Sequence, residues 1–421
     1  MDEHIDELES QLACLESLET LITRHRGDLT DSMQEHKASI SSLRRLPPEL
    51  LEGIFLLLAE DQLDLAWEIP DERIPMQAPW LFTRICRRWA DVALGSKMLW
   101  CRVSCPLESR MPTHGAASLM NLLHERSGSA PLSLRIRDSR AYTDDCFDVV
   151  LEQAGRWKNL DIELPAPPVL KKLEAVRGRL HNLSQLNIFT NKLESLGTLE
   201  DVPRFWDIFS DSVPELTNIL ADFYYSETWL CGSPPFTFPW RQLTCLDTTF
   251  ASSTEVYSVL KHLSSIVVLQ VTYAAPGAFP KQDIIRLPHL RVLEILLEDH
   301  PEESAYSTIL PSLLDCIDAP VLDELVTERA ANEKAMLHFI ERSGCTHSLQ
   351  YLQFRLDAQI PQSPETIVSI VRALPCLAEL VMVGEEAAFQ DVLSRINSCR
   401  KAMGAVLELA VRIVDPSEQV P

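Results

Sequence analysis

The chain has 421 residues, of which 46% are hydrophobic and 24% charged, a composition typical of a globular protein with two or three domains. Its formal net charge of −23 argues against binding to nucleic acid or to an anionic membrane surface, because both need a basic face that meets phosphates. No apolar stretch approaches the ~20 residues of a membrane span, and the first residues, Met1–His4, do not resemble a signal peptide.

The eleven cysteines indicate a reducing compartment. Their number is odd, they are scattered, and none forms a C-x-x-C pair, whereas proteins built on disulfides carry even numbers at regular spacings. Cys101 and Cys105 lie four residues apart, but no second pair or nearby histidine cluster completes a zinc site. We therefore expect a cytoplasmic or nuclear protein with no metal and no cofactor.

Residues 1–42 carry a heptad repeat. Position a holds Ile5, Leu12, Glu19, Arg26, Met33 and Ile40, and position d holds Leu8, Leu15, Ile22, Leu29, His36 and Leu43. Such spacing is typical of a coiled coil, although the charges at Glu19 and Arg26 weaken its middle. Two interpretations stay open: a coiled coil, such as a parallel homodimer in which Arg26 reaches an acidic group on the other strand, or a long amphipathic helix that folds back on its own chain.

A small helical domain is predicted over residues 43–105. Pro47 and Pro48 mark a helix start, since proline suits the first turn, and Glu49 adds a negative charge at the positive helix end. The apolar side chains that follow recur at helical period: Leu50, Leu51, Ile54, Phe55, Leu57 and Leu58. A second helix is predicted from the shared face of Leu81, Phe82, Ile85, Cys86, Trp89, Val92 and Ala93, with a stop at Gly95. A unit this small should need a partner for part of its apolar surface.

This region resembles an F-box. The resemblance rests on Leu46-Pro47-Pro48-Glu49-Leu50-Leu51 followed by Ile54-Phe55, on Cys86-Arg87-Arg88-Trp89, and on the closing Leu99-Trp100. The spacer over residues 60–78 is longer than the short turn usual in the family, which indicates an inserted loop. The layout, a heptad helix that runs into the F-box opening, resembles that of a large group of fungal F-box proteins.

Members of the F-box family dock on the Skp-type adaptor of SCF ubiquitin ligases and, through it, on a cullin scaffold. The resemblance implies an adaptor-binding role for Leu46, Pro47, Leu50, Leu51, Ile54 and Phe55 in the first half and for Cys86, Trp89, Leu99 and Trp100 in the second. An ordinary helical hairpin without a partner is the alternative interpretation of the same residues.

Residues 106–415 repeat the pattern apolar-x-x-apolar-x-apolar. Copies begin at Trp157, Leu183, Leu216, Leu243, Ile266, Leu290, Leu322, Leu349, Leu377 and Val406, with an earlier copy at Pro131. From residue 157 onward they lie 23 to 33 residues apart, and helical patterns over 254–264, 304–317, 333–342 and 365–374 separate some of them. Period and core pattern are those of leucine-rich repeats. We predict an α/β fold whose largest part is a curved solenoid of parallel strands and outer helices, followed by a tail over 416–421.

A closed barrel of βα units is the rival fold. Only 13 of the 421 residues are glycine, whereas barrel enzymes carry Gly-rich loops, and ten or eleven units are too many for a barrel. The asparagine that follows the core of a leucine-rich repeat occurs here only at Asn191. Longer helical turns should therefore supply the hydrogen bonds that an asparagine ladder usually provides.

In a solenoid, the residues between the repeated apolar positions face the concave side of the sheet. We predict that a target protein binds there, at Asp161, Asn187, Asp247, Gln270, Glu294 and Gln353, with Val326 and Val381 in equivalent positions. Residues 223–240 gather the aromatic side chains Tyr224, Tyr225, Trp229, Phe236 and Trp240. They indicate either an aromatic contact site or a satellite core under a long loop.

Common catalytic motifs are absent from the sequence, which has no G-x-S-x-G, P-loop, dinucleotide-binding fingerprint or H-E-x-x-H. We therefore expect that the chain is not an enzyme; a barrel enzyme is the remote third hypothesis. The leading hypothesis is a substrate-recognition subunit of an SCF-type ubiquitin ligase, with the F-box on the adaptor and the repeats on a target protein. The alternative is a structural or scaffold repeat protein that self-associates through its coiled coil and recruits no ligase.

Overall fold

The computed structural model describes residues 2–40, 46–61, 78–106, 113–137, 144–163, 171–189, 207–210, 213–222, 238–250, 253–273, 283–297, 309–327, 333–355, 364–383, 393–398 and 410–414. The chain forms two compact units, Met1–Leu99 and Trp100–Pro421. Each is described by itself.

The first unit is helical where it is described. α1 (Asp2–Ile40) covers nearly all of the predicted N-terminal helix, α2 (Pro48–Asp61) begins at the predicted proline, and α4 (Arg87–Gly95) ends at the predicted glycine. At the start of α2, the Leu51 N–H donates to the Pro47 carbonyl at 3.1 Å. Most of the predicted inserted loop, residues 62–77, lies outside the described residues.

The second predicted helix of this unit is divided in two. α3 (Phe82–Ile85) is separated from α4 by Cys86, whose φ of −161° and ψ of 166° are extended. The Cys86 carbonyl still accepts the first hydrogen bond of α4, from the Ala90 N–H at 2.9 Å. The apolar pattern continues across the break because Phe82 of α3 and Trp89 of α4 both contact Phe55 of α2.

The second unit begins at the end of a short 3-10 helix, η3 (Lys97–Trp100), and alternates strands with helices. Its main strands are β1 (Arg102–Pro106), β2 (Leu132–Arg137), β3 (Trp157–Glu163), β4 (Gln185–Phe189), β5 (Asn218–Asp222), β6 (Cys245–Phe250), β7 (Val268–Tyr273), β9 (Val292–Leu297), β11 (Glu324–Thr327), β12 (Tyr351–Arg355), β13 (Glu379–Val383) and β14 (Ala410–Val414). Its longer helices are α5 (Thr113–Ser127), α6 (Asp144–Glu152), α9 (Ser253–Leu260), α10 (Ile309–Cys316), α11 (Glu333–Ser343) and α12 (Pro364–Ala373).

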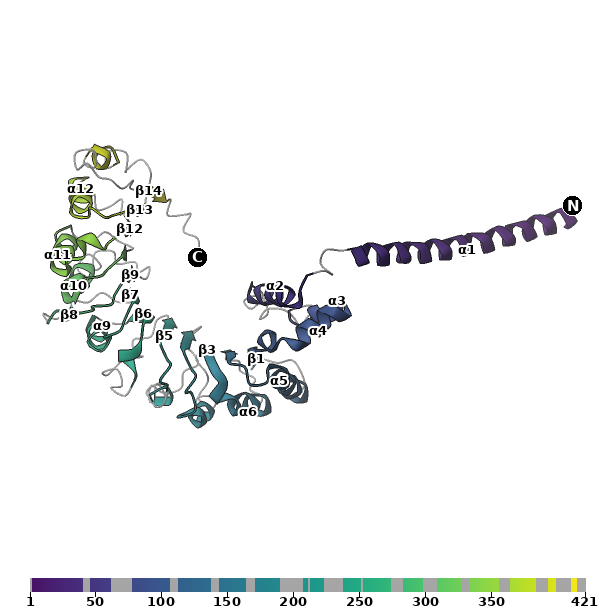
Figure 1. Ribbon diagram of the computed structural model, residues 1–421, viewed down its shortest axis with the longest axis horizontal. Helices are drawn as coiled ribbons and strands as arrows, with labels where there is room; N and C mark the ends of the chain where they lie inside the picture. The colour runs from purple at the N-terminus through teal and green to yellow at the C-terminus, as the bar shows by residue number, and fades with distance from the viewer. Residues whose placement is uncertain are drawn as a thin grey trace. The chain divides into compact units, whose positions relative to one another are not determined.

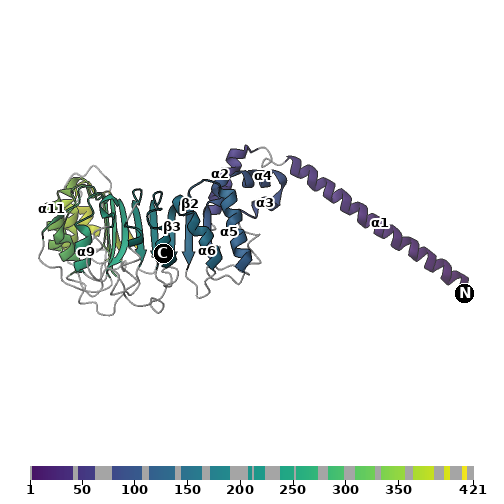
Figure 2. The same ribbon diagram turned by 90° about the horizontal axis from the view of Figure 1, so that it is seen from below.

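These strands form one large parallel sheet. Its order follows the chain, β1-β2-β3-β4-β5-β6-β7-β9-β11-β12-β13-β14, and neighbouring strands pair in parallel. Figure 1 shows the labelled helices α5, α6, α9, α10, α11 and α12 together on one side of the sheet, and Figure 2 shows strands β2 and β3 side by side. Each copy from Pro131 to Leu377 contains one strand of this sheet, so the predicted parallel strands and the mixed α/β class are confirmed. The last copy, at Val406, was placed two residues too early, because its sixth position, Val411, pairs with Leu380, the fourth position of the copy before it.

Two features of the sheet were not predicted. β1 lies in the range that the sequence assigned to the helical region, yet it pairs with β2 through Val103 and Leu134. β8 (Ile285–Arg286) and β10 (Ile317–Asp318) form a separate two-stranded ladder. Among the described strands, β1 pairs only with β2 and β14 only with β13, so the sheet is open, whereas a barrel would close these edges.

The core lies between the sheet and its helices. Side chains alternate between the two faces of a strand, and the fourth and sixth positions of each repeat point toward the helices. Leu160 and Ile162 of β3, like Leu293 and Ile295 of β9, are at most 1% exposed. The first position of the repeat is buried too, for example at Leu290. Among the described helices, none combines the length and the apolar character needed to cross a membrane.

Polar side chains connect successive strand–helix units. Asn182 donates to the Gly155 carbonyl at 2.6 Å, and Gln242 donates to the Leu216 carbonyl at 2.9 Å. Arg156 donates to the Ala130 carbonyl at 2.7 Å. Each bond spans 26 or 27 residues, which is about one repeat. All three acceptors precede a strand, whereas the asparagine position follows one, as Asn191 follows β4, and lies outside the described residues. The predicted role of helical turns at that position stays a prediction.

Candidate functional site

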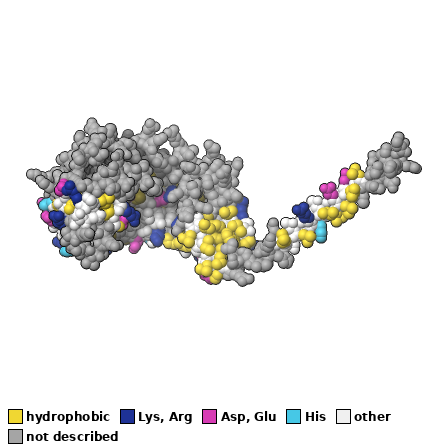
Figure 3. Space-filling model, turned by 90° about the horizontal axis from the view of Figure 1, so that it is seen from above, with side chains coloured by type: hydrophobic (Ala, Val, Ile, Leu, Met, Phe, Trp, Pro, Cys, Tyr) yellow, Lys and Arg dark blue, Asp and Glu magenta, His cyan; other side chains and the backbone are white. Residues whose placement is uncertain are grey.

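The first unit carries an exposed apolar stripe on α2. Leu50 is 57% exposed, Ile54 39%, Leu57 66% and Leu58 43%. Their spacing of four, three and one residues places them side by side on one face of the helix. We call these four residues the α2 stripe. Figure 3 shows hydrophobic side chains gathered on the surface of this unit and again along α1.

The neighbouring face of α2 is buried against α3 and α4. Leu51 is 1% exposed and Phe55 is fully buried. The Phe55 ring stacks on Phe82 with centroids 4.2 Å apart, and it meets Trp89 at 4.8 Å in a tilted arrangement. Offset and tilted ring pairs are the favourable aromatic geometries. This aromatic trio fixes the direction of α2, and thereby holds the α2 stripe on the outside.

Arg88 ties the start of α2 to α4. Its guanidinium donates to the carbonyl of Leu46, which lies 42 residues earlier in the chain. Leu46 is half-buried, whereas Pro47 and Cys86 are exposed. Two residues of the Arg-Arg-Trp segment therefore have a structural role, because Arg88 and Trp89 both contact α2 or the residue before it and hold this helix in place.

The ten residues with a predicted adaptor-binding role fall into three groups by exposure. Leu50, Ile54, Pro47 and Cys86 are exposed, and Leu46 and Trp89 are half-buried. Leu51, Phe55, Leu99 and Trp100 are at most 4% exposed. Trp100 belongs to the second unit, where the Arg126 guanidinium lies over its ring at 4.2 Å. Leu51 and Phe55 support the helices of the first unit from inside, and any contact with a partner falls to the exposed residues.

Sequence reasoning gave Leu57 and Leu58 no binding role. Both lie on the α2 stripe and are more exposed than Ile54. They belong to the helical apolar pattern, but they follow the part of the sequence that resembles the F-box opening. The helical apolar pattern of Leu50 and Ile54, continued by one more turn, would have predicted a role for both.

Charged side chains of both signs are exposed in the described part of this unit. Arg84 and Arg87, on either side of Cys86, are exposed, and so is Lys97 of η3. Glu49 at the start of α2 and Asp91 of α4 are exposed as well, so the described surface carries charges of both signs in addition to its apolar residues.

On the second unit, the six residues predicted to bind a target share one row of the sheet. The register pairs Asp161 with Asn187, Asp247 with Gln270, and Gln270 with Glu294. The complete row is Ser104, Arg135, Asp161, Asn187, Leu220, Asp247, Gln270, Glu294, Val326, Gln353, Val381 and Arg412. The predicted six are all half-buried, whereas Val326 and Val381 are buried. We call this row the central row.

Near β3 the central row is internally paired. The Arg135 guanidinium contacts the Asp161 carboxylate at 2.9 Å, and the Asn187 amide donates to the same carboxylate at 2.6 Å. Gln185 completes the network by donating to the Asn187 side-chain oxygen at 3.2 Å. The Asp161 carboxylate is thus already paired with a positive charge and a hydrogen-bond donor from its own sheet.

Toward β14 the same face is acidic. Burial, and next the neighbouring Glu324 carboxylate, raise the pKa of Glu294 above its usual range. Burial and the carboxylates of Asp323 and Glu379 likewise raise the pKa of Glu324. Glu379 contacts the Arg412 guanidinium at 3.1 Å. This part of the sheet face therefore concentrates negative charge.

Several polar residues on this face were not predicted from the sequence. Glu324, Tyr351 and Glu379 form a second row two residues before the central row, and they pair in register across β11, β12 and β13. The Tyr351 hydroxyl donates to the Gln353 side-chain oxygen at 2.7 Å, which joins the two rows. Side chains two positions apart on a strand lie on the same face. The sequence could therefore have identified this second row as the residues two positions before the central row.

Most of the predicted aromatic loop, including Tyr224, Tyr225, Trp229 and Phe236, lies outside the described residues. Its described end is buried: Trp240 is 6% exposed, and its ring lies 4.6 Å from that of Phe238. This end belongs to the main core of the second unit, and both interpretations of the rest of the segment stay predictions.

No cluster of three or more metal-ligating side chains occurs among the described residues. A scan of the sequence against protein-family models found no match, and a search of curated protein sequences found none either.

Proposed function

We propose that this chain is a non-catalytic substrate receptor that docks on a Skp-type adaptor through its first unit and holds a target protein on its sheet. The observation that carries the proposal is the α2 stripe, four large apolar side chains that stay exposed beside a closed aromatic core. Monomeric proteins rarely expose contiguous apolar patches unless these bind a partner. The F-box resemblance of the surrounding residues suggests which partner.

The contribution of such a receptor to ubiquitin transfer is proximity. The adaptor and cullin scaffold would hold the chemistry, and the second unit would keep the target near it. Holding two reactants together turns a bimolecular encounter into an effectively local one. No side chain of this chain needs to take part in bond making, in accord with its lack of common catalytic motifs.

The second unit supplies the surface for the target in this proposal. We interpret it as a solenoid of leucine-rich-repeat type, which is supported by the recurring strand, the parallel register and the helices on one side. Repeat arrays of this kind bind proteins across an extended sheet face. The central row and its neighbouring acidic row are the residues placed for this contact.

The test is co-purification with a Skp-type adaptor. The full-length chain should recover the adaptor, and the double substitution Leu50→Asp plus Leu57→Asp should abolish recovery, because it places two charges in the α2 stripe. Both side chains are more than half exposed, so the fold should survive. Leu21→Asp, an equally exposed leucine on α1, is the matched control and should recover the adaptor fully. Equal recovery by the double variant and the wild type would exclude the proposed contact.

A scaffold protein without a ligase is the second candidate. It is favoured by α1, whose described apolar side chains are exposed along the helix. Under this function the chain would self-associate, and neither the wild type nor any variant would recover the adaptor. The same co-purification therefore separates the two candidates.

A further inference from the structure

α1 presents an apolar stripe to solvent. Among its described side chains, Leu12, Leu15, Ile22, Leu29 and Met33 occupy a and d positions of the heptad and are 51% to 65% exposed. In proteins, most of the stability of a helix comes from packing of its apolar face rather than from intrinsic propensity. A helix of 39 residues with this face exposed is therefore incomplete by itself.

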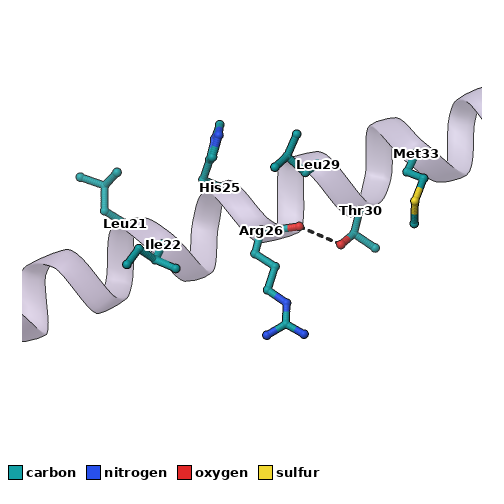
Figure 4. Close-up of a pocket in the computed structure, with 7 residues that line it drawn as sticks. All are labelled: Leu21, Ile22, His25, Arg26, Leu29, Thr30 and Met33. Atoms are coloured by element: carbon teal, nitrogen blue, oxygen red, sulfur yellow. Dashed lines mark hydrogen bonds between the residues drawn. The ribbon is translucent and has the colours of Figure 1, made fainter.

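The middle of the stripe forms a shallow groove on the helix surface. It is lined by Leu21, Ile22, His25, Arg26, Leu29, Thr30 and Met33. Figure 4 shows Arg26 directed to one side of the helix and Leu21 and His25 to the other. The Thr30 hydroxyl donates to the Arg26 carbonyl at 2.8 Å. The polar group at this edge is thus satisfied within the helix and does not compete with an apolar partner.

We propose that a second copy of this chain covers the stripe, with the two α1 helices antiparallel and with facing residue numbers that sum to about 41. Leu12 of each copy then lies opposite Leu29 of the other, and Glu19 opposite Ile22. The overlap runs along almost the whole helix, and a two-fold axis makes every contact twice. This inference does not rest on the adaptor contact.

The charges in the heptad favour the antiparallel arrangement over the parallel one. In a parallel pair in register, equal a positions face each other. Glu19 would then meet Glu19 and Arg26 would meet Arg26, two layers of like charge. In the antiparallel pair each a residue faces a d residue, and Arg26 lies within about one residue of Glu16 from the other copy, which is within reach of its long side chain.

The charge distribution along the helix points the same way. Between Asp2 and Leu21, all charged residues are Asp or Glu. The basic residues of the helix, Arg24, Arg26 and Lys37, all follow Leu21. A parallel pair would place the two acidic halves side by side. The antiparallel pair places each acidic half against the half that contains the basic residues, which is neutral overall because Asp28, Asp31 and Glu35 balance them. This arrangement avoids the repulsion between two acidic halves and brings opposite charges within reach.

Sedimentation of the full-length chain tests the association. The wild type should form a dimer across the micromolar range, and Ile22→Asp should raise the dissociation constant by about tenfold or more, since it places a charge in the seam. Ser17→Asp is the control, because Ser17 is also exposed on α1 but lies outside both the a/d stripe and the groove. A monomeric wild type, or equal loss in both variants, would overturn the proposal.

Photo-crosslinking tests the direction. A benzophenone side chain at position 12 of the full-length chain should cross-link to the peptide around Leu29 of a second, isotope-labelled copy. Within one helix these positions are about 26 Å apart at 1.5 Å per residue, so one copy cannot make this link by itself. Cross-links to the peptide around position 12 would show a parallel pair and overturn the proposal.

Discussion

Neighbouring residues of α2 have opposite roles. Leu50 and Leu51 are adjacent, yet the first is 57% exposed and the second 1%. Phe55 is fully buried in the aromatic trio, whereas Ile54 beside it is exposed. Residues one position apart on a helix point about 100° apart, so a wide apolar arc can face its own chain with one half and solvent with the other.

Substitutions on the two halves of this arc should differ sharply in stability. Phe55→Ala should lower the free energy of unfolding by about 3–5 kcal/mol, because it empties the space between Phe82 and Trp89. Leu50→Ala should change it by no more than about 0.5 kcal/mol, because the side chain is already in water. Urea denaturation followed by tryptophan fluorescence measures both. A loss for Leu50→Ala as large as that for Phe55→Ala would contradict the assigned burial.

Glu294 on the sheet face should make stability depend on pH. Burial and the Glu324 carboxylate raise its pKa in the folded chain above the ordinary value of 4.5. The folded state therefore holds the proton more tightly, and the contribution of this group is fully present below pH 4.5 and is lost as the pH rises through the raised pKa. The gain in stability from Glu294→Gln over the wild type should thus be larger at about pH 8 than at about pH 4.

The measurement is urea denaturation of both chains at the two pH values. Glu341→Gln, on the exposed side of α11, serves as the matched control and should show no such difference between the two conditions. A gain for Glu294→Gln that is the same at both pH values would show that Glu294 is not destabilised by its surroundings.

At the scale of elements, arginine side chains hold the strand–helix units together. Arg342 of α11, whose side chain is 15% exposed, donates to the carbonyl of Ile317 at 2.6 Å and to that of Leu314. Both acceptors belong to the strand–helix repeat that precedes α11 in the second unit. Arg156 does the same nearer the start of the sheet. The contacts are charge-assisted, which makes them stronger than bonds between neutral groups.

Arg342→Ala should lower the free energy of unfolding by about 1–3 kcal/mol, because it leaves two carbonyl groups without this donor. Arg395→Ala is the control, since Arg395 and Glu365 form an exposed ion pair with side chains 45% and 65% exposed, and such pairs contribute about 0–1 kcal/mol. Hydrogen exchange at the amides of α10 and β10 locates the effect. Unchanged exchange there in Arg342→Ala would contradict this connecting role.

The elements were predictable to the extent that local pattern determines them. The repeated apolar pattern marked the strands of the large sheet from β2 to β13, because each copy alternates buried and exposed positions, and it missed the phase of β14 by two residues. β1 was not recognised because its copy of the pattern, Trp100, Val103 and Cys105, overlaps the residues that resemble the F-box. The break at Cys86 was not predicted, because side-chain periodicity does not report one extended residue.

The candidate site was predictable in part for a related reason. The central row followed from the repeat, since copies in phase bring equivalent residues into register. The division of α2 into a buried and an exposed half did not follow, because Leu50, Leu51 and Phe55 share one apolar arc. Only the position of α3 and α4 decides which half is covered.

At the scale of the whole molecule, the two units have separate cores. The large buried cluster between sheet and helices runs from Cys101 to Ile396, and all of its members lie in the second unit. The aromatic trio of Phe55, Phe82 and Trp89 lies in the first. A large unit of this kind buries enough apolar surface for its own stability, whereas a small one is marginal alone.

A fragment of residues 97–421 should therefore fold without the first unit. Its main unfolding transition in urea should keep the midpoint of the same transition in the full chain, because the midpoint reports the core of the second unit. Circular dichroism should show that strand and helix content of the sheet unit is retained. A fragment that is unfolded or markedly less stable would show that the sheet depends on residues before Lys97.

The most direct test of the account is a calorimetric titration of the full-length chain with a purified Skp-type adaptor. We predict saturable binding with a negative heat-capacity change, the mark of apolar burial, and its loss in Leu50→Asp plus Leu57→Asp but not in Leu21→Asp. Absence of binding by the wild type, or unchanged affinity in the double variant, would contradict the claim that the α2 stripe is a docking surface.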